Sequence, residues 1–264
     1  LCSIIDEARQ QVAVSVSNTM TMMYWHIGDT IYTYVLEGQR AAYGQQIVST
    51  LSTKLTELYG KDFTDRNLRR MIQFSQAFPK VEIVSTLSTK LYWSHFMEVL
   101  PLKDNLAREF YVTMAASEHW SVKRLRKEID SMLFERTIIS RKPEDFIRAE
   151  LATLRDDNRL SPDLVFKNPY FLDFTGLTGF YQERDLEDML LNGIQQFLME
   201  LGSGFTFVER QKRMIIDGED FRLDLLFYHR KLRRLIAIDL KRTRFKPAYK
   251  GQMELYLRYL DKHE

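Results

Sequence analysis

The sequence predicts an α+β protein in which a helical first part precedes a second part that contains a β-sheet. Two observations lead to this fold class. Apolar residues recur at three- to four-residue steps through much of the first 135 residues, which is the spacing of amphipathic helices. Between Phe205 and Lys241 apolar and polar residues tend to alternate, as they do in strands. The polar stretch DDNRLSPD, at Asp156–Asp163, separates the two patterns, so we predict domains at residues 1–157 and 158–264.

Helices account for most of the predicted first domain. One of them begins at Thr64, a favourable N-cap residue, and is limited by Pro79. The nonapeptide IVSTLSTKL occurs twice, at Ile47–Leu55 and Ile83–Leu91, but two copies are too few to predict a solenoid. The other helices are expected near Ile5–Val35, Gln45–Tyr59, Asp104–Glu118 and Ser121–Glu135.

The helix predicted after Ser121 is basic, since it carries Lys123, Arg124, Arg126 and Lys127. Short helices followed by a basic one are typical of helix-turn-helix and winged-helix DNA readers. The same charges also suit the solvated face of a packing helix, and no pattern of base-reading residues separates the two interpretations. The first domain is therefore expected to bind DNA or to mediate assembly, and a homo-oligomer stays open.

The predicted second domain contains a three-stranded region between two helices. Asp217-Gly218 is a strong signal for a two-residue hairpin turn. The elements are expected to follow one another as helix Glu183–Leu201, strand Phe205–Ile216, strand Glu219–Tyr228, basic turn His229–Arg234, strand Leu235–Lys241 and a helix that Pro247 opens.

Three charged residues on these strands predict a chemical site. Because side chains alternate between the faces of a strand, Asp224 should lie opposite the apolar set within Phe221–Phe227. Asp239 and Lys241 should share one face of the next strand. Burying such charges costs several kcal/mol unless something compensates them, as a divalent cation beside the lysine would. Mg²⁺ prefers oxygen ligands, which Asp224, Asp239 and the backbone carbonyl of Leu240 could supply. The alternative is a structural ion pair between strands.

Such a site suits hydrolysis of a phosphodiester bond. The metal would act as a Lewis acid and activate water, while Lys241 would position the attacking water and stabilise the charge that develops on phosphorus. Glu209 and Gln211 share a strand face near the site and are weaker candidates. The five histidines show no metal-ligand spacing, and the sequence contains no Gly-rich phosphate loop, Ser-His-Asp arrangement or CxxC motif.

Charge and composition narrow the partners. The net charge is only +2, but Phe205–Lys250 holds thirteen Lys and Arg against six Asp and Glu, which suits a phosphate backbone or else a solvated basic surface. Cys2 is the single cysteine and excludes an internal disulfide. No apolar run approaches the roughly 18 residues of a membrane span, and no signal peptide is visible. We therefore expect a cytoplasmic protein whose partner is nucleic acid, with no membrane.

The order of these elements resembles the PD-(D/E)XK nuclease core, in which a helical acid is followed by a hairpin, an Asp, and a motif matched here by Asp-Leu-Lys. Glu187 matches the helical acid, which often joins the metal site. Gln252 and Tyr256, in GQMELY, match the Gln-x-x-x-Tyr element of RecB-like members. Nearly the whole chain resembles the bacterial YhcG-type family, through the stretches YWHIG, RNLRRM, WSHF, REFY, IDSMLFERT, LSPDLVFKNPYFLDF and FVERQKR.

This resemblance implies a helical, winged-helix-like N-terminal domain before a restriction-endonuclease-like α/β core with a central mixed sheet. It also implies a nuclease that cleaves DNA in restriction, recombination or repair, with Mg²⁺ or Mn²⁺ as cofactor. A further strand is expected beyond Glu264. The resulting candidate catalytic residues are Asp224, Asp239, Lys241, Glu187, Gln252 and Tyr256, and the candidate metal ligands are Asp224, Asp239, Leu240 and Glu187.

Asp239 departs from the pattern of the close relatives, which usually have Glu at this position. Its carboxylate reaches one methylene less far. This departure keeps one other function open beside the metal-dependent deoxyribonuclease, and assembly through the helical domain leaves a second one open. One is a nucleic-acid-binding protein that keeps the nuclease fold with weak catalysis, and the other is a protein-interaction scaffold.

Overall fold

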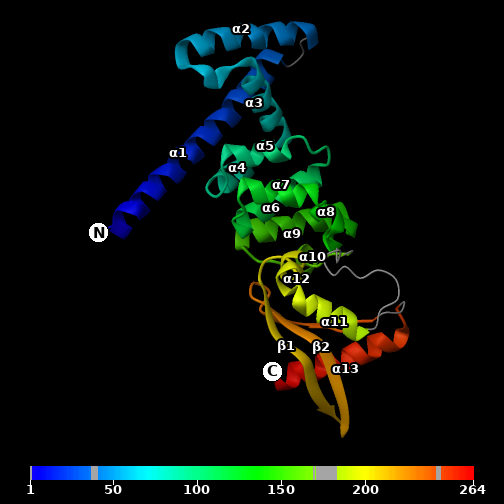
Figure 1. The fold of residues 1–264 in the computed structure, drawn as a ribbon. Helices are drawn as coiled ribbons and strands as arrows, with labels where there is room; N and C mark the ends of the chain where they lie inside the picture. The colour runs from blue at the N-terminus through cyan, green and yellow to red at the C-terminus, as the bar shows by residue number, and fades with distance from the viewer. Residues whose placement is uncertain (1, 37–40, 169, 171–182, 242–244) are drawn as a thin grey trace. The chain divides into compact units, whose positions relative to one another are not determined.

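The computed structural model describes residues 2–36, 41–168, 170, 183–241 and 245–264, and its fold is α+β (Figure 1). The chain divides into two compact units. Unit 1 comprises Leu1–Glu135 and Pro143–Asn158, and unit 2 comprises Arg136–Lys142 and Arg159–Glu264. A single cut near residue 158 would assign Arg136–Lys142 to the first domain, whereas its contacts place it in unit 2.

Unit 1 is helical throughout its described residues. This confirms the predicted helical domain, and the strands that would form the wing of a winged-helix domain are not among its described residues. Nor does any described helix combine the length and the apolar character needed to cross a bilayer. The elements are α1 (Cys2–Thr30), the π-helical turn η1 (Ile31–Leu36), α2 (Ala41–Tyr59), η2 (Lys61–Phe63), α3 (Asp65–Ala77), α4 (Val81–Ser88), α5 (Trp93–Val99), α6 (Asn105–Glu118), α7 (Val122–Asp130), α8 (Leu133–Arg136) and α9 (Glu144–Asp157).

Helices α1 and α3 approach each other closely at Gly28. A Cβ on this residue would lie 1.9 Å from the backbone oxygen of Met71, so only a glycine permits the crossing. One turn earlier, the Trp25 indole donates a hydrogen bond of 2.8 Å to the backbone oxygen of Phe78. The YWHIG stretch is thus explained by packing. The core on this side of the unit consists of Ile31, Val48, Leu68, Met71 and Ile72.

The predicted helix Ser121–Glu135 is interrupted where Met132 takes a left-handed φ of 55°. The buried Tyr111 of α6 holds the two pieces together. Its hydroxyl accepts a hydrogen bond from the backbone N–H of Phe134 at 3.1 Å and donates one to the backbone oxygen of Glu128 at 3.4 Å. Burial raises the pKa of Tyr111 well above its ordinary value, so the hydroxyl stays protonated.

The two copies of IVSTLSTKL fold differently at their ends. The first copy lies wholly within α2, whereas the second leaves α4 after Ser88 and turns. The buried positions nevertheless correspond, since Val48 and Ser52 in the first copy match Val84 and Ser88 in the second. Local sequence therefore sets the buried face of each helix, while the surroundings decide where the helix ends.

Unit 2 contains a three-stranded antiparallel sheet in the order β1-β2-β3. The described strands all pair antiparallel, and a parallel strand, which the predicted mixed sheet requires, is not among them. The predicted helix Glu183–Leu201 is interrupted at Gly193. The elements are η3 (Ile138–Arg141), α10 (Pro162–Val165), α11 (Glu183–Asn192), α12 (Ile194–Leu201), β1 (Phe205–Ile216), β2 (Glu219–His229), β3 (Arg234–Ile238) and α13 (Pro247–His263).

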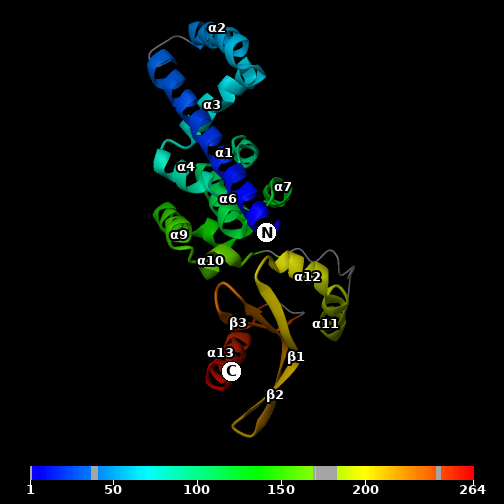
Figure 2. The ribbon, with the colours of Figure 1, turned by 90° about the vertical axis from the view of Figure 1, so that its left-hand side faces the viewer.

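Apolar clusters cover the sheet on both faces, with α11 and α12 on one side and α13 on the other (Figure 2). Leu225 and Phe227 pack with residues of α11 and α12, such as Leu190 and Phe197. Leu223 packs instead with residues of α13. The prediction of one apolar face over Phe221–Phe227 is therefore wrong, because the alternation of strand β2 does not continue across Asp224.

A buried charge cluster ties Arg136–Lys142 into unit 2. The Arg136 guanidinium lies 2.8 Å from the Glu200 carboxylate of α12, and the Lys167 ammonium lies 3.8 Å from the same oxygen. Backbone hydrogen bonds join the same segments, from Ile138 to Phe166 and from Asn168 to Arg136. These contacts explain why a segment flanked by unit 1 belongs to unit 2.

Candidate active site

Asp224, Asp239 and Lys241 come together where strands β2 and β3 separate. The ladder between these strands ends at the pair Leu225↔Ile238. Beyond it, the Asp224 carboxylate accepts the backbone N–H of Leu240 at 2.6 Å, so a side chain takes the donor that a longer ladder would have used. This is why β3 ends at Ile238 rather than at Lys241 as predicted. Asp239 and Lys241 therefore lie just past the strand.

Lys241 is held by a charge and by an aromatic ring. Its ammonium lies 2.7 Å from the Asp239 carboxylate and 5.6 Å from the centre of the Tyr249 ring of α13. The side chain of Asp239 is 8% exposed and that of Lys241 is 23% exposed. The ammonium is thus placed beside a nearly buried carboxylate and still reaches solvent.

Burial raises the pKa of the Asp239 carboxyl above its ordinary value. The Lys241 ammonium acts in the opposite direction, and the adjacent Asp224 carboxyl raises the pKa further. Two carboxyl groups therefore lie close enough to repel each other, and the Lys241 ammonium contacts one of them. Mutual repulsion of this kind is what a bound cation relieves.

The donor set fits a hard divalent cation. Asp224, Asp239 and the Leu240 carbonyl offer oxygen atoms, which Mg²⁺ and Mn²⁺ prefer, and no sulfur or imidazole lies among them. The residues that the structure describes include no group of three or more His, Cys, Asp or Glu arranged to hold a metal. Two carboxylates with several waters are nevertheless a usual protein contribution to a Mg²⁺ site.

Glu187, the predicted helical acid, lies in α11. Its side chain is outside the described residues, so the structure neither brings it to the carboxylate pair nor separates it from them.

Gln252 and Tyr256 form a pair of their own. The Gln252 amide donates a hydrogen bond to the Tyr256 hydroxyl, which in turn donates to the backbone oxygen of Arg222 at 3.4 Å. The Tyr256 ring is buried in the cluster beneath β2 and packs against Phe221. Within the described part of unit 2, this pair supports the strand that carries Asp224 and makes no hydrogen bond to the carboxylates.

The two weaker candidates on β1 differ in their contacts. The Glu209 carboxylate lies 3.2 Å from the Lys212 ammonium and is exposed, so it belongs to the surface of the strand. The Gln211 amide instead donates a hydrogen bond of 3.1 Å to Asp224. Sequence reasoning did not identify Tyr249. No periodicity marks it, because its contact with Lys241 depends on how α13 packs.

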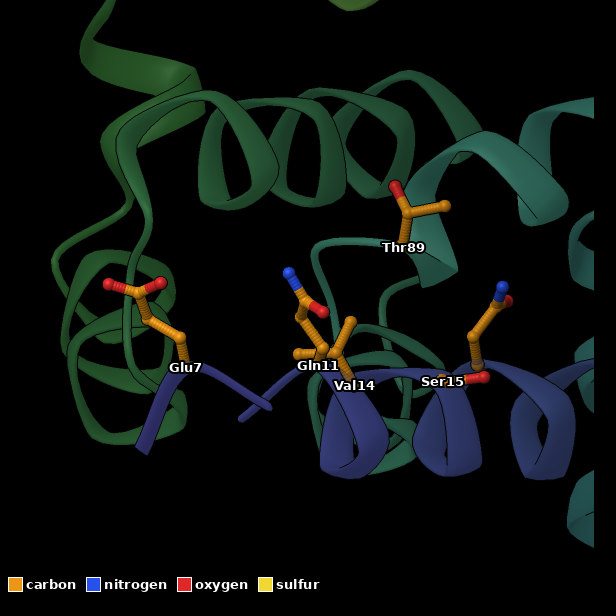
Figure 3. A pocket seen from close by; sticks show the side chains of 6 residues that line it. Glu7, Gln11, Val14, Ser15 and Thr89 are labelled. Carbon is orange, nitrogen blue, oxygen red and sulfur yellow. The ribbon is translucent and has the colours of Figure 1, made fainter. Parts of the chain in front are cut away.

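A shallow hollow of about 510 Å³ lies apart from this chemistry, within unit 1. Figure 3 shows that side chains of α1 face Thr89, which follows α4. The described residues that line it include one carboxylate, Glu7, and no basic group. The lining residues are Glu7, Gln11, Val14, Ser15, Asn18 and Thr89.

Comparisons with known proteins show the family of the chain. Residues 1–136 match the DUF1016 N-terminal domain family, and residues 163–264 match the YhcG PDDEXK nuclease domain family. The "Putative nuclease YhcG" of Escherichia coli (strain K12) is 33% identical over 290 residues of alignment, which cover 98% of this chain and 76% of that protein. No solved structure matches the chain. The nuclease-domain match includes the residues that carry the carboxylate pair, and the relative aligns with 98% of this chain. This chain therefore belongs to the YhcG family of PDDEXK nucleases.

Proposed function

We propose that this chain is a divalent-metal-dependent deoxyribonuclease, with Mg²⁺ as the metal and Mn²⁺ as a substitute. The observation that carries the proposal is the cluster that Asp224, in the middle of β2, forms with Asp239 and Lys241, just past the end of β3. A nearly buried carboxylate beside a second one, with an ammonium 2.7 Å away, is a costly arrangement that a structural ion pair does not require. The nuclease family of the chain supports the same reading.

The proposed roles follow from the chemistry of each group. Asp224, Asp239, the Leu240 carbonyl and Glu187 would hold the cation, which when bound supplies Lewis-acid polarisation of the phosphate and activation of water. The Lys241 ammonium would orient the attacking water and stabilise the negative charge that grows on the phosphate oxygens. Tyr249 and Asp239 keep that ammonium in place.

Gln252 and Tyr256 would affect the metal site indirectly, through the strand that carries Asp224. Their hydrogen-bond chain ends on the backbone oxygen of Arg222, two residues before Asp224 on the same strand. A fixed strand keeps the Asp224 carboxylate at a constant depth in the site. We therefore assign them to positioning β2 rather than to contact with the phosphate.

DNA as the substrate is supported by the distribution of charge. The turn between β2 and β3 exposes Arg230, Lys231 and Arg233, and the next residue, Arg234 at the start of β3, is exposed as well. In unit 1, the exposed Lys123 and Lys127 lie one turn apart on α7. Cationic side chains on two surfaces suit a long polyanion, whose phosphates would be neutralised with release of counterions.

The test is cleavage by the purified chain of linear, circular, branched and single-stranded DNA, with Mg²⁺, with Mn²⁺ and with neither. We expect cleavage that needs a metal and that falls by about 100-fold or more in Lys241→Ala, since removing one preorganised charge from a transition state typically costs that much. Lys262→Ala is the matched control, because Lys262 is an exposed lysine of the same unit.

Three results would count against the proposal. Equal cleavage by wild type and Lys241→Ala would remove the lysine from the reaction. Salt-dependent binding of DNA without cleavage of any substrate would favour a binding protein with a nuclease fold. Absence of both binding and cleavage would favour a protein-interaction scaffold.

A further inference from the structure

Gln211 is joined to the candidate metal site from strand β1. Its side-chain amide donates a hydrogen bond of 3.1 Å to Oδ1 of Asp224, while the backbone N–H of Leu240 donates to Oδ2 of the same carboxylate at 2.6 Å. Only the NH₂ end of a glutamine can donate to a carboxylate, so the contact fixes which way the amide is turned. Two donors on two oxygens hold the Asp224 carboxylate in one orientation, and each oxygen keeps a lone pair for a cation.

The backbone of β1 is irregular at two places near this contact. A register shift between Phe207 and Glu209 inserts one extra residue into the strand, and Gln211 itself takes a left-handed φ of 49°. The pairs on either side of Gln211, Arg210↔Leu225 and Lys212↔Leu223, remain in register, so Gln211 lies opposite Asp224. The left-handed conformation of Gln211 is therefore separate from the bulge before it.

Left-handed backbone is unfavourable for glutamine, and Asn or Gly would adopt it more easily. An unfavourable conformation persists where the surroundings impose it, and such positions cluster at functional sites. A glutamine at this left-handed position, in place of Asn or Gly, is explained if the longer side-chain amide is needed to reach Asp224.

We propose that Gln211 is a positioning residue that presents the Asp224 carboxylate to a divalent cation. The inference rests on the proposed metal site and concerns binding of the cation, not the cleavage of DNA. Outer groups that orient a metal ligand typically change metal affinity by about 10- to 100-fold when they are removed.

Two substitutions separate positioning from a purely structural role. Gln211→Asn keeps an amide and suits the left-handed backbone better, but it is one methylene too short for the same contact. Gln211→Met keeps the length of the side chain and removes the donor. Gln196→Met is the matched control, because Gln196 is an exposed glutamine of the same unit.

The measurement is binding of Mn²⁺ without DNA, followed by electron paramagnetic resonance of the free ion, with the Tm of each variant recorded. We expect both Gln211 variants to bind Mn²⁺ about 10- to 100-fold more weakly. The Tm of Gln211→Asn should equal or exceed that of wild type, and Gln196→Met should match wild type in both measurements. A structural role alone would not weaken the metal in a variant that is equally stable.

Mn²⁺ affinities within twofold of wild type in both variants would overturn the inference, as would weaker binding that appears only with loss of the fold. Absence of Mn²⁺ binding by wild type would overturn it as well. A wild type that binds Mn²⁺ and cleaves no DNA would end the nuclease proposal and still leave the role of Gln211 tested.

Discussion

Replacing Gly28 by alanine would place a methyl group against the backbone of α3. The new Cβ would lie 1.9 Å from the oxygen and 2.3 Å from the carbon of the Met71 carbonyl. Ordinary contact begins near 3.4 Å, so α1 and α3 would have to separate locally by about 1.5 Å. The carbonyl belongs to a helix and cannot rotate away, which leaves movement of the whole helix as the relief.

The expected cost follows from these distances. Overpacking a core costs about 1–3 kcal/mol when side chains can adjust, and a backbone obstacle should put the cost at the upper end or above. Alanine regains up to about 1 kcal/mol through its higher helix propensity. Separating the helices would also loosen Leu68 and Met71, which are fully buried. We expect the free energy of unfolding of unit 1 to fall by about 2 kcal/mol or more.

Urea unfolding followed by tryptophan fluorescence measures this loss, because all three tryptophans, Trp25, Trp93 and Trp120, lie in unit 1. The control is Gly251→Ala in α13, where no atom lies within 4 Å of the position a Cβ would take. Its unfolding, followed by circular dichroism, should show a free energy of unfolding that is unchanged or raised by up to about 1 kcal/mol. An unchanged or raised unfolding midpoint for Gly28→Ala would refute the close approach of α1 and α3.

Two further predictions concern charges of unit 1. Arg126 lies 2.6 Å from Glu98 and lowers the pKa of the Glu98 carboxyl. The stabilisation that this ion pair gives the folded protein is therefore fully present above the pKa of the unfolded state, and it is lost as the pH falls through the pKa of the folded state. Glu98→Gln should therefore lower the free energy of unfolding in urea by about 0.5 kcal/mol at pH 7, and this cost should shrink as the pH falls below the ordinary pKa of a glutamate. A cost that does not change with pH would contradict this. Replacing Lys123 and Lys127 by alanine should reduce the slope of log K against log salt for duplex DNA by about 0.9 per lysine that contacts a phosphate. Arg126→Ala should change this slope less, because Arg126 is already paired with Glu98. Equal slopes for wild type, the double lysine variant and Arg126→Ala would show that α7 does not contact DNA.

Elements with local causes could be predicted from the sequence. The turn at Asp217-Gly218 takes left-handed φ values of 52° and 84°, which is the geometry that this dipeptide favours in a hairpin. Helix α9 also carries local signals, because Ile147, Leu151 and Leu154 are buried at helical spacing after Pro143. It was nevertheless not predicted.

Elements with long-range causes could not be predicted. Strand β3 is short because a side chain from another strand takes the N–H of Leu240. The faces of β2 were assigned wrongly because the alternation of the strand breaks at Asp224, which places Leu223 on the side of α13 and Leu225 on the side of α11 and α12.

The candidate site shows the same division. Asp224, Asp239 and Lys241 are recognisable in the sequence because charged residues interrupt apolar strands. Their roles in binding a metal and in cleavage stay predictions until the variants are measured. The contacts of Gln211 and Tyr249 depend on strand register and on helix packing, which no spacing along the chain encodes.

The placement of Arg136–Lys142 has a consequence for synthesis of the chain on the ribosome. The polypeptide passes between the two units three times, at residues 135–136, 142–143 and 158–159. Arg136 emerges 64 residues before its partner Glu200, a delay of roughly 3–13 s at ordinary rates of translation. During that interval α9 can complete unit 1, while Arg136, in the segment before α9, still lacks the Glu200 carboxylate that pairs with it. A chain that starts at Arg159 would lack the segment Arg136–Lys142, so its Glu200 carboxylate would keep the Lys167 ammonium and lose the Arg136 guanidinium.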